Sequence, residues 1–387
     1  MVNSLKDINT MIERLNVAKN IREDFAADLF TLRRILDTKI DELALGIPRR
    51  NVPGFPVWDA SEPSVRAVFN DLVKPRDVAF DIGAHIGGLT SSLSRMVGVR
   101  GIVVAFEASA ATCAQLTTNL AINHHTNVTV VHAAVFDKPN VMVSLVNDGA
   151  ASRVANDETE VAAERVETVV LDDYCRDNGL APSFIKLDIE GAEFSALSGA
   201  SEILSRDRPH IVFEHNMWDD RVMQMLRERG YWLMDTARYC EVRASADCET
   251  TSNTSNILAI HTSRLAETPY AALPKVCLVA EFRPEAGTLV DGVRRISHDL
   301  SPGRYLFEII GEVDPETHIL FSRAALGGDV IGQSWTGASF FIHNHRYLPF
   351  QARFFGNYLF EVGEVGSSTS VCEHFKIRLH RVDFPSR

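Results

Sequence analysis

Three hydrophobic patterns follow one another along the chain. From 3 to 45, leucine and isoleucine recur every three or four positions among charged residues, which predicts amphipathic helices. From 77 to 261, short apolar runs alternate with helical patterns, and from 270 to 387 apolar and polar positions alternate between turns. We therefore expect a helical segment with a linker at 1–62, a doubly wound α/β domain at 63–264, and an antiparallel β-sandwich-like domain at 270–387.

The N-terminal helical pattern must bury its apolar face, and the sequence leaves two partners open. It can pack on its own chain, or it can contact another subunit in a homo-oligomer. A linker at 46–63 contains several prolines, which exclude a continuous helix into the next domain. Phe55 and Trp58 in this linker could cover a ligand cleft, although packing in a core is the simpler use.

The elements expected in the middle domain alternate between strand and helix. We expect strands at 78–80, 102–106, 128–135, 141–146, 184–188, 210–214 and 256–261, and helices at 109–123, 192–204 and 218–229. This order is typical of a parallel sheet with helices on both faces, in which ligands bind at the carboxyl ends of the strands.

The C-terminal domain is expected to contain strands at 304–310, 339–343, 357–362 and 374–382. A set of aromatic and basic residues in this domain could bind a glycan, since aromatic faces stack on sugar rings. The same residues could instead complete a core or a subunit interface. The set is Trp335, His343, His345, Arg346 and Tyr347.

The bulk composition narrows the class of protein. The 387 residues are 45% hydrophobic, as in an ordinary globular protein, and the net charge is -12. Because binding to phosphates needs a basic surface, this charge disfavours a nucleic-acid partner. The six cysteines have no paired short spacing, so neither a zinc site nor a disulfide framework is indicated. No apolar run approaches the ~20 residues that cross a bilayer, and no basic-then-apolar leader begins the chain, so we expect a cytoplasmic protein without a membrane span.

Candidate chemistry begins at a glycine-containing turn that follows the strand at 78–80. The turn reads Asp-x-Gly-x-x-x-Gly through Asp81, Gly83 and Gly87, and Glu107 ends the next expected strand, where it can accept both ribose hydroxyls of a nucleoside. An acid directly before such a turn would repel the pyrophosphate of a dinucleotide. S-adenosylmethionine (SAM) has no phosphate and carries an ammonium, which Asp81 could meet directly or through water.

A second charged stretch surrounds the end of the strand at 184–188. Lys186 and Asp188 interrupt and end a strand that should be buried, which favours a functional use. Glu190 follows in the loop, and for Glu193 a solvated loop position is the simpler expectation.

Carboxylates end several of the expected strands. The strand at 210–214 ends in Glu214 and is followed by His215. The strand-end acids Asp81, Glu107, Asp188 and Glu214 together predict a polar ligand at this edge of the sheet, since packing does not require that pattern.

Five motifs resemble those of FkbM-type SAM-dependent methyltransferases, over roughly 75–261. They are Phe80-Asp-Ile-Gly-Ala-His-Ile-Gly-Gly, Ala105-Phe-Glu107, Val169-Val-Leu-Asp-Asp-Tyr174, Ile185-Lys-Leu-Asp-Ile-Glu-Gly-Ala-Glu193 and Leu197-Ser-Gly-Ala200. The resemblance implies a Rossmann-like methyltransferase fold and O-methylation of a sugar or natural-product hydroxyl. His85 departs from the asparagine common in the family, and Ala108-Ser109 replaces a frequent proline.

We assign roles on this basis. The residues expected to bind SAM are Asp81, Gly83, His85, Gly87 and Glu107, with Ala134 near the adenine. Asp188 is expected to orient the methionine end or the acceptor, and Lys186 is counted among the catalytic residues. The candidates for a general base are Asp188, Glu190, Glu214 and His215, and Glu190 or His215 is the preferred one. A divalent cation held by Asp188, Glu190 and Glu214 is a rival explanation that we do not favour.

Three functions stay open at this point. The first is O-methylation of a sugar or glycosylated metabolite, and the second is O-methylation of a polyketide or peptide. The third is a non-catalytic glycan-binding or assembly protein with a vestigial methyltransferase core. The simultaneous presence of Asp81, Glu107, Lys186, Asp188 and Glu190 argues against the third.

Overall fold

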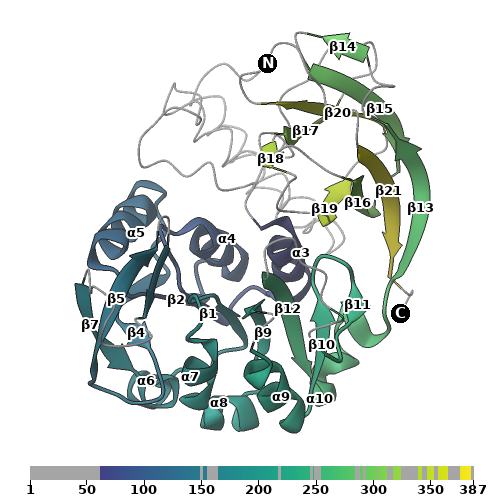
Figure 1. Cartoon of the computed structure of the whole chain (residues 1–387). Coiled ribbons are helices and arrows are strands. Elements are labelled where there is room, and N and C mark those ends of the chain that lie inside the picture. The colour runs from purple at the N-terminus through teal and green to yellow at the C-terminus, as the bar shows by residue number, and fades with distance from the viewer. Residues whose placement is uncertain are drawn as a thin grey trace, which may run out of the picture. The chain divides into compact units, whose positions relative to one another are not determined.

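The structure is a computed structural model of the chain (Figure 1). It describes residues 62–148, 151–154, 164–216, 219–244, 247, 254–283, 288–290, 293–301, 303–311, 317–323, 339–341, 347–352, 356–364 and 375–384. The helices expected at 3–45, the linker up to residue 61, Phe55 and Trp58 lie outside these residues.

A central sheet of the order β11-β10-β12-β9-β8-β1-β2-β3 organises the middle domain. Its strands are β1 (Val78–Ile82), β2 (Ile102–Glu107), β3 (Val128–His132), β8 (Phe184–Leu187), β9 (His210–Asn216), β10 (Tyr231–Asp235), β11 (Cys240–Glu241) and β12 (Thr254–His261). The pairs from β3 to β9 are parallel, and β12 runs antiparallel to both of its neighbours, β9 and β10. The strands expected from the sequence at these places are confirmed, whereas β10 and β11 were not predicted.

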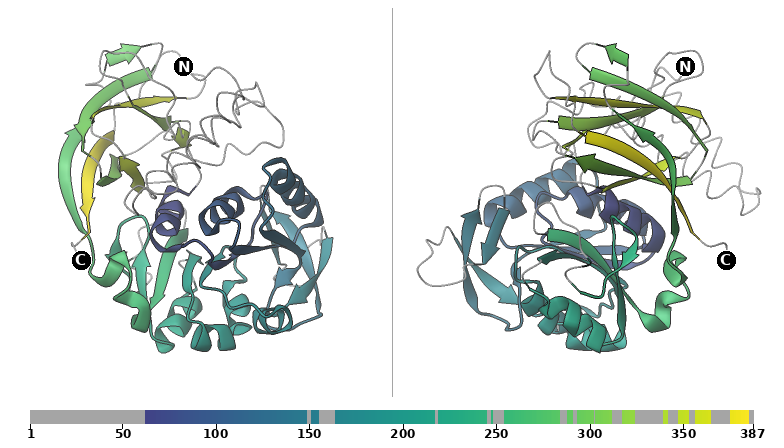
Figure 2. Two further views of the ribbon diagram at one scale, coloured as in Figure 1. Left: turned by 180° about the vertical axis from the view of Figure 1, so that it is seen from behind. Right: turned by 45° about the vertical axis from the view of Figure 1, so that its right-hand side comes forward.

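Helices cover both faces of this sheet (Figures 1 and 2). They are α3 (Pro63–Leu72), α4 (Gly88–Val97), α5 (Ala110–Ile122), α6 (Leu171–Asn178), α7 (Glu193–Ser198), α8 (Ser201–Arg206), α9 (Arg221–Glu228) and α10 (Thr262–Leu265). Neighbouring residues of β1 enter different cores because strand side chains alternate between faces. Ala79 packs with apolar residues of α3 and α4, and Phe80 packs with those of α6 to α9. This arrangement confirms the doubly wound α/β fold.

The helix expected at 192–204 is interrupted. It divides into α7 and α8 around Gly199, whose position leaves no room for a side chain, since a Cβ atom there would lie 2.5 Å from the carbonyl oxygen of Phe136. The helix pattern in the sequence is correct on both sides of this close contact, but the pattern alone does not show the contact.

A small sheet of order β4-β7-β5-β6 adjoins the central sheet (Figure 1). It contains β4 (Ala134–Val135), β5 (Met142–Asp148), β6 (Ala151–Val154) and β7 (Glu164–Val169). The strand expected at 141–146 corresponds to β5, and the strand expected at 128–135 divides into β3 and β4. The sequence analysis did not predict β6, β7 or α6.

The C-terminal domain consists of two antiparallel sheets. One has the order β13 (Lys275–Phe282), β21 (Phe375–Asp383), β16 (Gly303–Gly311) and β19 (Tyr347–Ala352). The other has the order β14 (Thr288–Val290), β15 (Val293–Leu300), β20 (Gly356–Glu364), β17 (Thr317–Arg323) and β18 (Ser339–Phe341). The four strands expected here are confirmed. The suggested glycan-binding residues Trp335, His343, His345 and Arg346, and the side chain of Tyr347, lie outside the described residues.

A buried ion pair joins α3 to the first of these sheets. The guanidinium of Arg304 on β16 donates to both carboxylate oxygens of Asp71 at 2.6 and 2.5 Å, and the hydroxyl of Tyr270 donates to the same carboxylate. Both charged side chains are nearly buried, at 11% and 12% exposure. The paired charges satisfy each other where water has little access.

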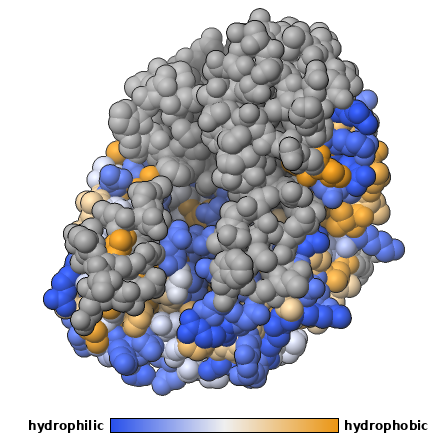
Figure 3. Space-filling view, in the orientation of Figure 1, coloured by the Kyte–Doolittle hydropathy of each residue, from blue (hydrophilic) through white to orange (hydrophobic). Residues whose placement is uncertain are grey.

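The described surface is mostly hydrophilic in the view of Figure 3, with an apolar patch on the right, where Figure 1 places β13. Val276, Leu278 and Val279 of this edge strand are exposed. Within the described residues, no helix is both long enough and apolar enough to span a bilayer.

Candidate active site

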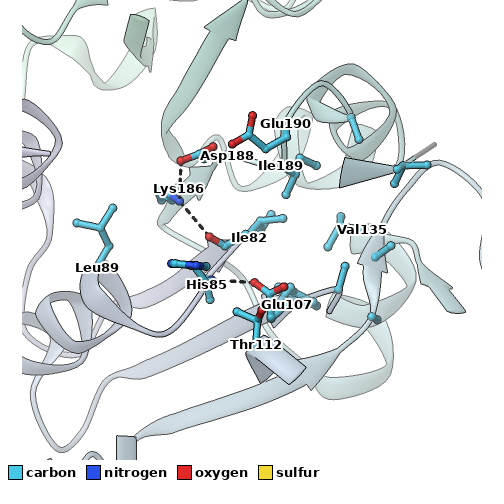
Figure 4. Close-up of a pocket in the computed structure, with 18 of the residues that line it drawn as sticks. Ile82, His85, Leu89, Glu107, Thr112, Val135, Lys186, Asp188, Ile189 and Glu190 are labelled. Atoms are coloured by element: carbon cyan, nitrogen blue, oxygen red, sulfur yellow. Dashed lines mark hydrogen bonds and ion pairs between the residues drawn. The ribbon is translucent and has the colours of Figure 1, made fainter. Parts of the chain in front are cut away.

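A cavity of about 340 Å³ opens at the carboxyl ends of β1, β2 and β8 (Figure 4). The strand order reverses at β1, because β2 lies on one side of it and the later strand β8 lies on the other. In open α/β sheets, ligands bind in the crevice at this reversal of strand order. Of the residues proposed from the sequence, those that line the cavity are Gly83, His85, Glu107, Ala134, Lys186, Asp188 and Glu190.

Gly83 allows the turn after β1 to approach the end of β8. Its φ of +81° lies in the left-handed region, and an added Cβ would lie 1.7 Å from the carbonyl oxygen of Asp188. No residue with a side chain fits this position. Gly87, with φ +96°, is the N-cap of α4, and a Cβ there would lie 2.7 Å from Leu116. Both glycines therefore shape the cavity through the backbone, although Gly87 itself is not among its described lining residues.

Glu107 is held rigidly at the end of β2. One carboxylate oxygen accepts from the backbone N–H of His85 at 2.8 Å, and the other accepts from that of Ser109 at 2.9 Å (Figure 4). The side chain is only 8% exposed, yet it lines the cavity. Each carboxylate oxygen can accept a further bond, so Glu107 can receive two neighbouring hydroxyl groups.

One part of the cavity wall is apolar. Phe106, Ala134 and Val135 contribute from the central and small sheets, and Leu145 and Val154 contribute from β5 and β6. Ala134 packs in one buried cluster with Leu145 and Val166. A flat apolar ring would be sheltered from water here, next to Glu107.

Lys186 connects three groups at the opposite part of the cavity. Its ammonium lies 3.2 Å from Asp188 Oδ2 and 3.8 Å from Asp81 Oδ1, and it donates to the carbonyl oxygen of Gly83 at 3.2 Å. Burial disfavours the cation, but the nearby carboxylates outweigh burial, so the pKa of Lys186 is raised. The lysine therefore stays charged and fixes the turn after β1 to the loop after β8.

Asp81 is placed behind this lysine. Its side chain is fully buried and accepts from the Thr90 hydroxyl at 2.6 Å, and it is not among the described lining residues. Burial raises the pKa of Asp81, and Lys186 and Thr90 offset part of the rise. In this position Asp81 holds Lys186 and the first turn of α4. A role of Asp81 in cofactor binding stays a prediction. Asp81 would act indirectly, by holding Lys186 in place.

Three carboxylates meet beside the cavity. Oxygen atoms of Asp188, Glu190 and Glu214 all lie within 4.8 Å of one another. Glu190 is exposed and has a φ of +53°, in the region disfavoured for residues with a side chain. The sequence-based prediction that Asp188 and Glu214 come together at one edge of the sheet therefore agrees with their placement.

One acidic and one basic side chain, those of Glu193 and His215, are buried where the sequence suggests contact with solvent or with a ligand. Glu193 is buried, at 6% exposure, and its carboxylate accepts from the backbone N–H groups of Ile189 and Gly191. The expectation of a solvated Glu193 is therefore wrong, because its side chain folds back to satisfy the loop. His215 is 1% exposed, lies 3.7 Å from Asp220, and is not among the described lining residues. Burial lowers the pKa of His215.

Glu62 also lines the cavity, and sequence analysis missed it. It precedes Pro63 at the start of α3, in a stretch that resembles a linker. No local pattern connects it with residues around Lys186, since only the packing of α3 against the sheet brings them together.

Part of the domain that carries this cavity resembles known proteins. Residues 81–233 match the methyltransferase FkbM domain. No curated protein matches the chain. Among solved structures, a methyltransferase FkbM from Methylobacillus flagellatus shares 18% identity over 55% of this chain and 59% of that one, with a TM-score of 0.33. A precorrin-6y C5,15-methyltransferase from Geobacter metallireducens shares 16% identity over 53% of this chain and 91% of that one, with a TM-score of 0.34. An Aeropyrum pernix fibrillarin, solved with bound SAM, shares 12% identity over 52% of this chain and 76% of that one, with a TM-score of 0.34.

Proposed function

We propose that this chain, whose residues 81–233 form an FkbM methyltransferase domain, is a SAM-dependent O-methyltransferase that acts on a hydroxyl of a sugar or glycosylated metabolite. The observation that carries the proposal is the cavity. It combines the rigidly held carboxylate of Glu107, which can bind a ribose, with a group of carboxylates that can bind a hydroxyl acceptor. SAM would supply an electrophilic methyl group to this cavity.

The residues of the cavity fit the cofactor. Glu107 offers two oxygen atoms to the ribose hydroxyls, and the apolar wall around Ala134 and Leu145 suits the adenine. Gly83 lines the cavity, and its lack of a side chain lets the turn after β1 lie against the backbone of Asp188.

The carboxylates beside the cavity support a hydroxyl acceptor. A sugar hydroxyl donates readily to carboxylate oxygens, and a carboxylate in contact with it can take its proton as the methyl group is transferred. Glu190 is the best-placed base because it is exposed and lines the cavity. Asp188 is already paired with Lys186, and the buried His215 would need a relay to reach the acceptor. Alignment of the two reacting atoms would supply much of the rate.

The test is a transfer assay with SAM that carries a deuterated methyl group. The acceptors are a panel of monosaccharides, nucleotide sugars, polyketide alcohols and hydroxylated peptides, analysed by mass spectrometry and fragmentation. A label on the oxygen of a saccharide supports the proposal. A label on a polyketide or peptide oxygen supports the second acceptor class, and a label on carbon or nitrogen contradicts O-methylation. Absence of calorimetric SAM binding by the intact protein would exclude the enzyme altogether.

The cluster of Asp188, Glu190 and Glu214 keeps a divalent cation as a competing explanation for the same carboxylates. Oxygen ligands are those that Mg²⁺ and Ca²⁺ prefer. Turnover should survive EDTA if the carboxylates act alone. Loss of turnover in EDTA and its recovery with Mg²⁺ would instead assign the cluster to the metal.

A further inference from the structure

Glu62 is placed where it can act on a ligand. Glu62 lies at the start of α3 and lines the same cavity as Lys186, Asp188 and His85. No hydrogen bond of its carboxylate to another described residue is present, whereas Glu107 and Glu193 are both held by backbone N–H groups. Glu62 is thus a cavity carboxylate whose oxygen atoms are available to a ligand.

The backbone at Glu62 is strained. Its φ of +48° and ψ of 60° lie in the left-handed region, which suits glycine rather than glutamate. The residue also precedes Pro63, and a residue before proline favours an extended conformation. Such strain persists at sites where the surrounding structure enforces it, and these sites are often functional. The side chain of Glu62 contributes nothing as a helix cap that would explain it.

The charges around Glu62 favour a cationic ligand. Two cations, Lys186 and Arg66, act on Glu62, and its neighbouring carboxylates are those of Asp188 and Asp81, so three carboxylates still outnumber two cations. Burial raises the pKa of Glu62, Lys186 and Arg66 offset part of this rise, and Asp188 and Asp81 add to it. An added ammonium would relieve the repulsion among these carboxylates.

We infer that Glu62 is the carboxylate that binds the ammonium of the cofactor's methionine part, directly in the cavity, while Asp81 acts behind it by holding Lys186. The inference rests on the proposed use of SAM. An ammonium has three donors and forms its strongest bonds with a carboxylate, so one accessible oxygen pair is sufficient. Asp81 is fully buried and already accepts from Thr90, which leaves Glu62 the better placed of the two.

The test is calorimetric binding of three probes to the full-length protein. SAM and S-adenosylhomocysteine both carry the ammonium, and 5′-methylthioadenosine lacks the amino-acid part. Glu62→Gln should weaken both ammonium-bearing probes by about 10- to 100-fold and leave 5′-methylthioadenosine within about twofold, because a single charge-assisted bond is lost. Unchanged 5′-methylthioadenosine binding also shows that the variant is folded.

Two further variants separate binding from structure. Glu62→Gly relieves the strained φ, so it should keep or raise the melting temperature while it weakens SAM as Glu62→Gln does. Glu202→Gln removes an exposed carboxylate of α8 that does not line the cavity, and it should leave SAM binding within about threefold. Equal SAM affinity in wild type and Glu62→Gln overturns the inference alone, and so does an equal loss in Glu202→Gln. If wild type binds none of the three probes, the proposed function fails with it.

Discussion

At the scale of single residues, the cavity depends on a few positions that have no freedom to change. Gly83 lies against the backbone of Asp188, Glu107 is fixed by two backbone N–H groups, and Lys186 bridges the two loops. Each of these residues performs a structural task and lines the cavity at the same time. A substitution is therefore expected to affect stability and SAM binding together, and a control variant must separate the two.

Gly83→Ala tests the close approach of the two loops. The added methyl group would lie 1.7 Å from a backbone oxygen, so the loops must separate. We expect a loss of more than about 3 kcal/mol in the free energy of unfolding and no detectable SAM binding. The matched control is Gly179→Ala, which has φ +62° in the left-handed region but meets no atom within 4 Å, and it should lose only about 1–2 kcal/mol. Equal losses in urea unfolding would show that strain, not the contact, governs Gly83.

Lys186→Met tests the buried charge cluster. Asp81 and Asp188 would lose their cationic partner, and breaking a buried pair costs about 3–5 kcal/mol. The double variant Lys186→Met with Asp81→Asn should recover part of this loss, because one uncompensated charge is removed with its partner. Lys376→Met, which breaks an exposed pair with Glu281, should cost no more than about 1 kcal/mol. Chemical denaturation of these proteins and of the single variant Asp81→Asn gives the comparison, and a loss in the double variant equal to the sum of the two single losses would contradict the coupling.

At the scale of elements, the loop between β8 and α7 has an irregular backbone that needs hydrogen bonds from outside the loop to hold its conformation. Gly191 has φ +101° and Glu190 has φ +53°, so the loop uses conformations that a helix or strand would not supply. Glu193 in the first turn of α7 binds the loop amides and thereby carries the loop's geometry into the helix. The position of Glu190 in the cavity is thus set by a side chain that does not face the ligand.

Glu193→Ala should loosen this loop without unfolding the domain. The backbone N–H groups of Ile189 and Gly191 lose their acceptor, which costs about 1–3 kcal/mol. Hydrogen exchange should accelerate at these two amides and remain unchanged along β1. Glu202→Ala, on the exposed face of α8, is the control and should leave exchange at Ile189 as in the wild type. Protection of Ile189 that survives in Glu193→Ala would show that the loop holds itself.

At the scale of the whole molecule, burial couples stability to pH. His210 begins β9 with 5% of its surface exposed, and burial lowers its pKa to about 3. Above pH ~6.5 the imidazole is neutral in both the folded and the unfolded state, and it does not affect stability. Below that pH the unfolded chain takes up a proton that the folded protein excludes, so stability falls as the pH falls toward 3.

The expected fall from His210 is about 2 kcal/mol between pH 6.5 and pH 5, at about 1.4 kcal/mol per pH unit. Urea unfolding at pH 7.5 and pH 5.0 measures it. His210→Gln has no ionisable ring, so its stability should fall by about 2 kcal/mol less over the same interval, whatever its absolute stability. Parallel profiles for the two proteins would refute a role for His210.

The sequence by itself determined the elements and the chemistry that local pattern encodes. Apolar runs ending in Asp81, Glu107 and Asp188 predicted the strands and their edge, since a parallel sheet places all carboxyl ends together. The alternation after residue 270 likewise predicted the antiparallel sheets. Motif resemblance then pointed to an FkbM-type methyltransferase, and residues 81–233 match the methyltransferase FkbM domain.

Only the tertiary structure decided which carboxylates face the cavity. Asp81 and Glu62 are both acids near the ends of elements, and spacing cannot show that one is enclosed by Thr90 and Lys186 while the other is accessible. Glu193 is buried for the same kind of reason, because its partners are backbone groups of its own loop. Burial and hydrogen bonding are properties of packed neighbours, and packing brings together residues that the sequence keeps apart.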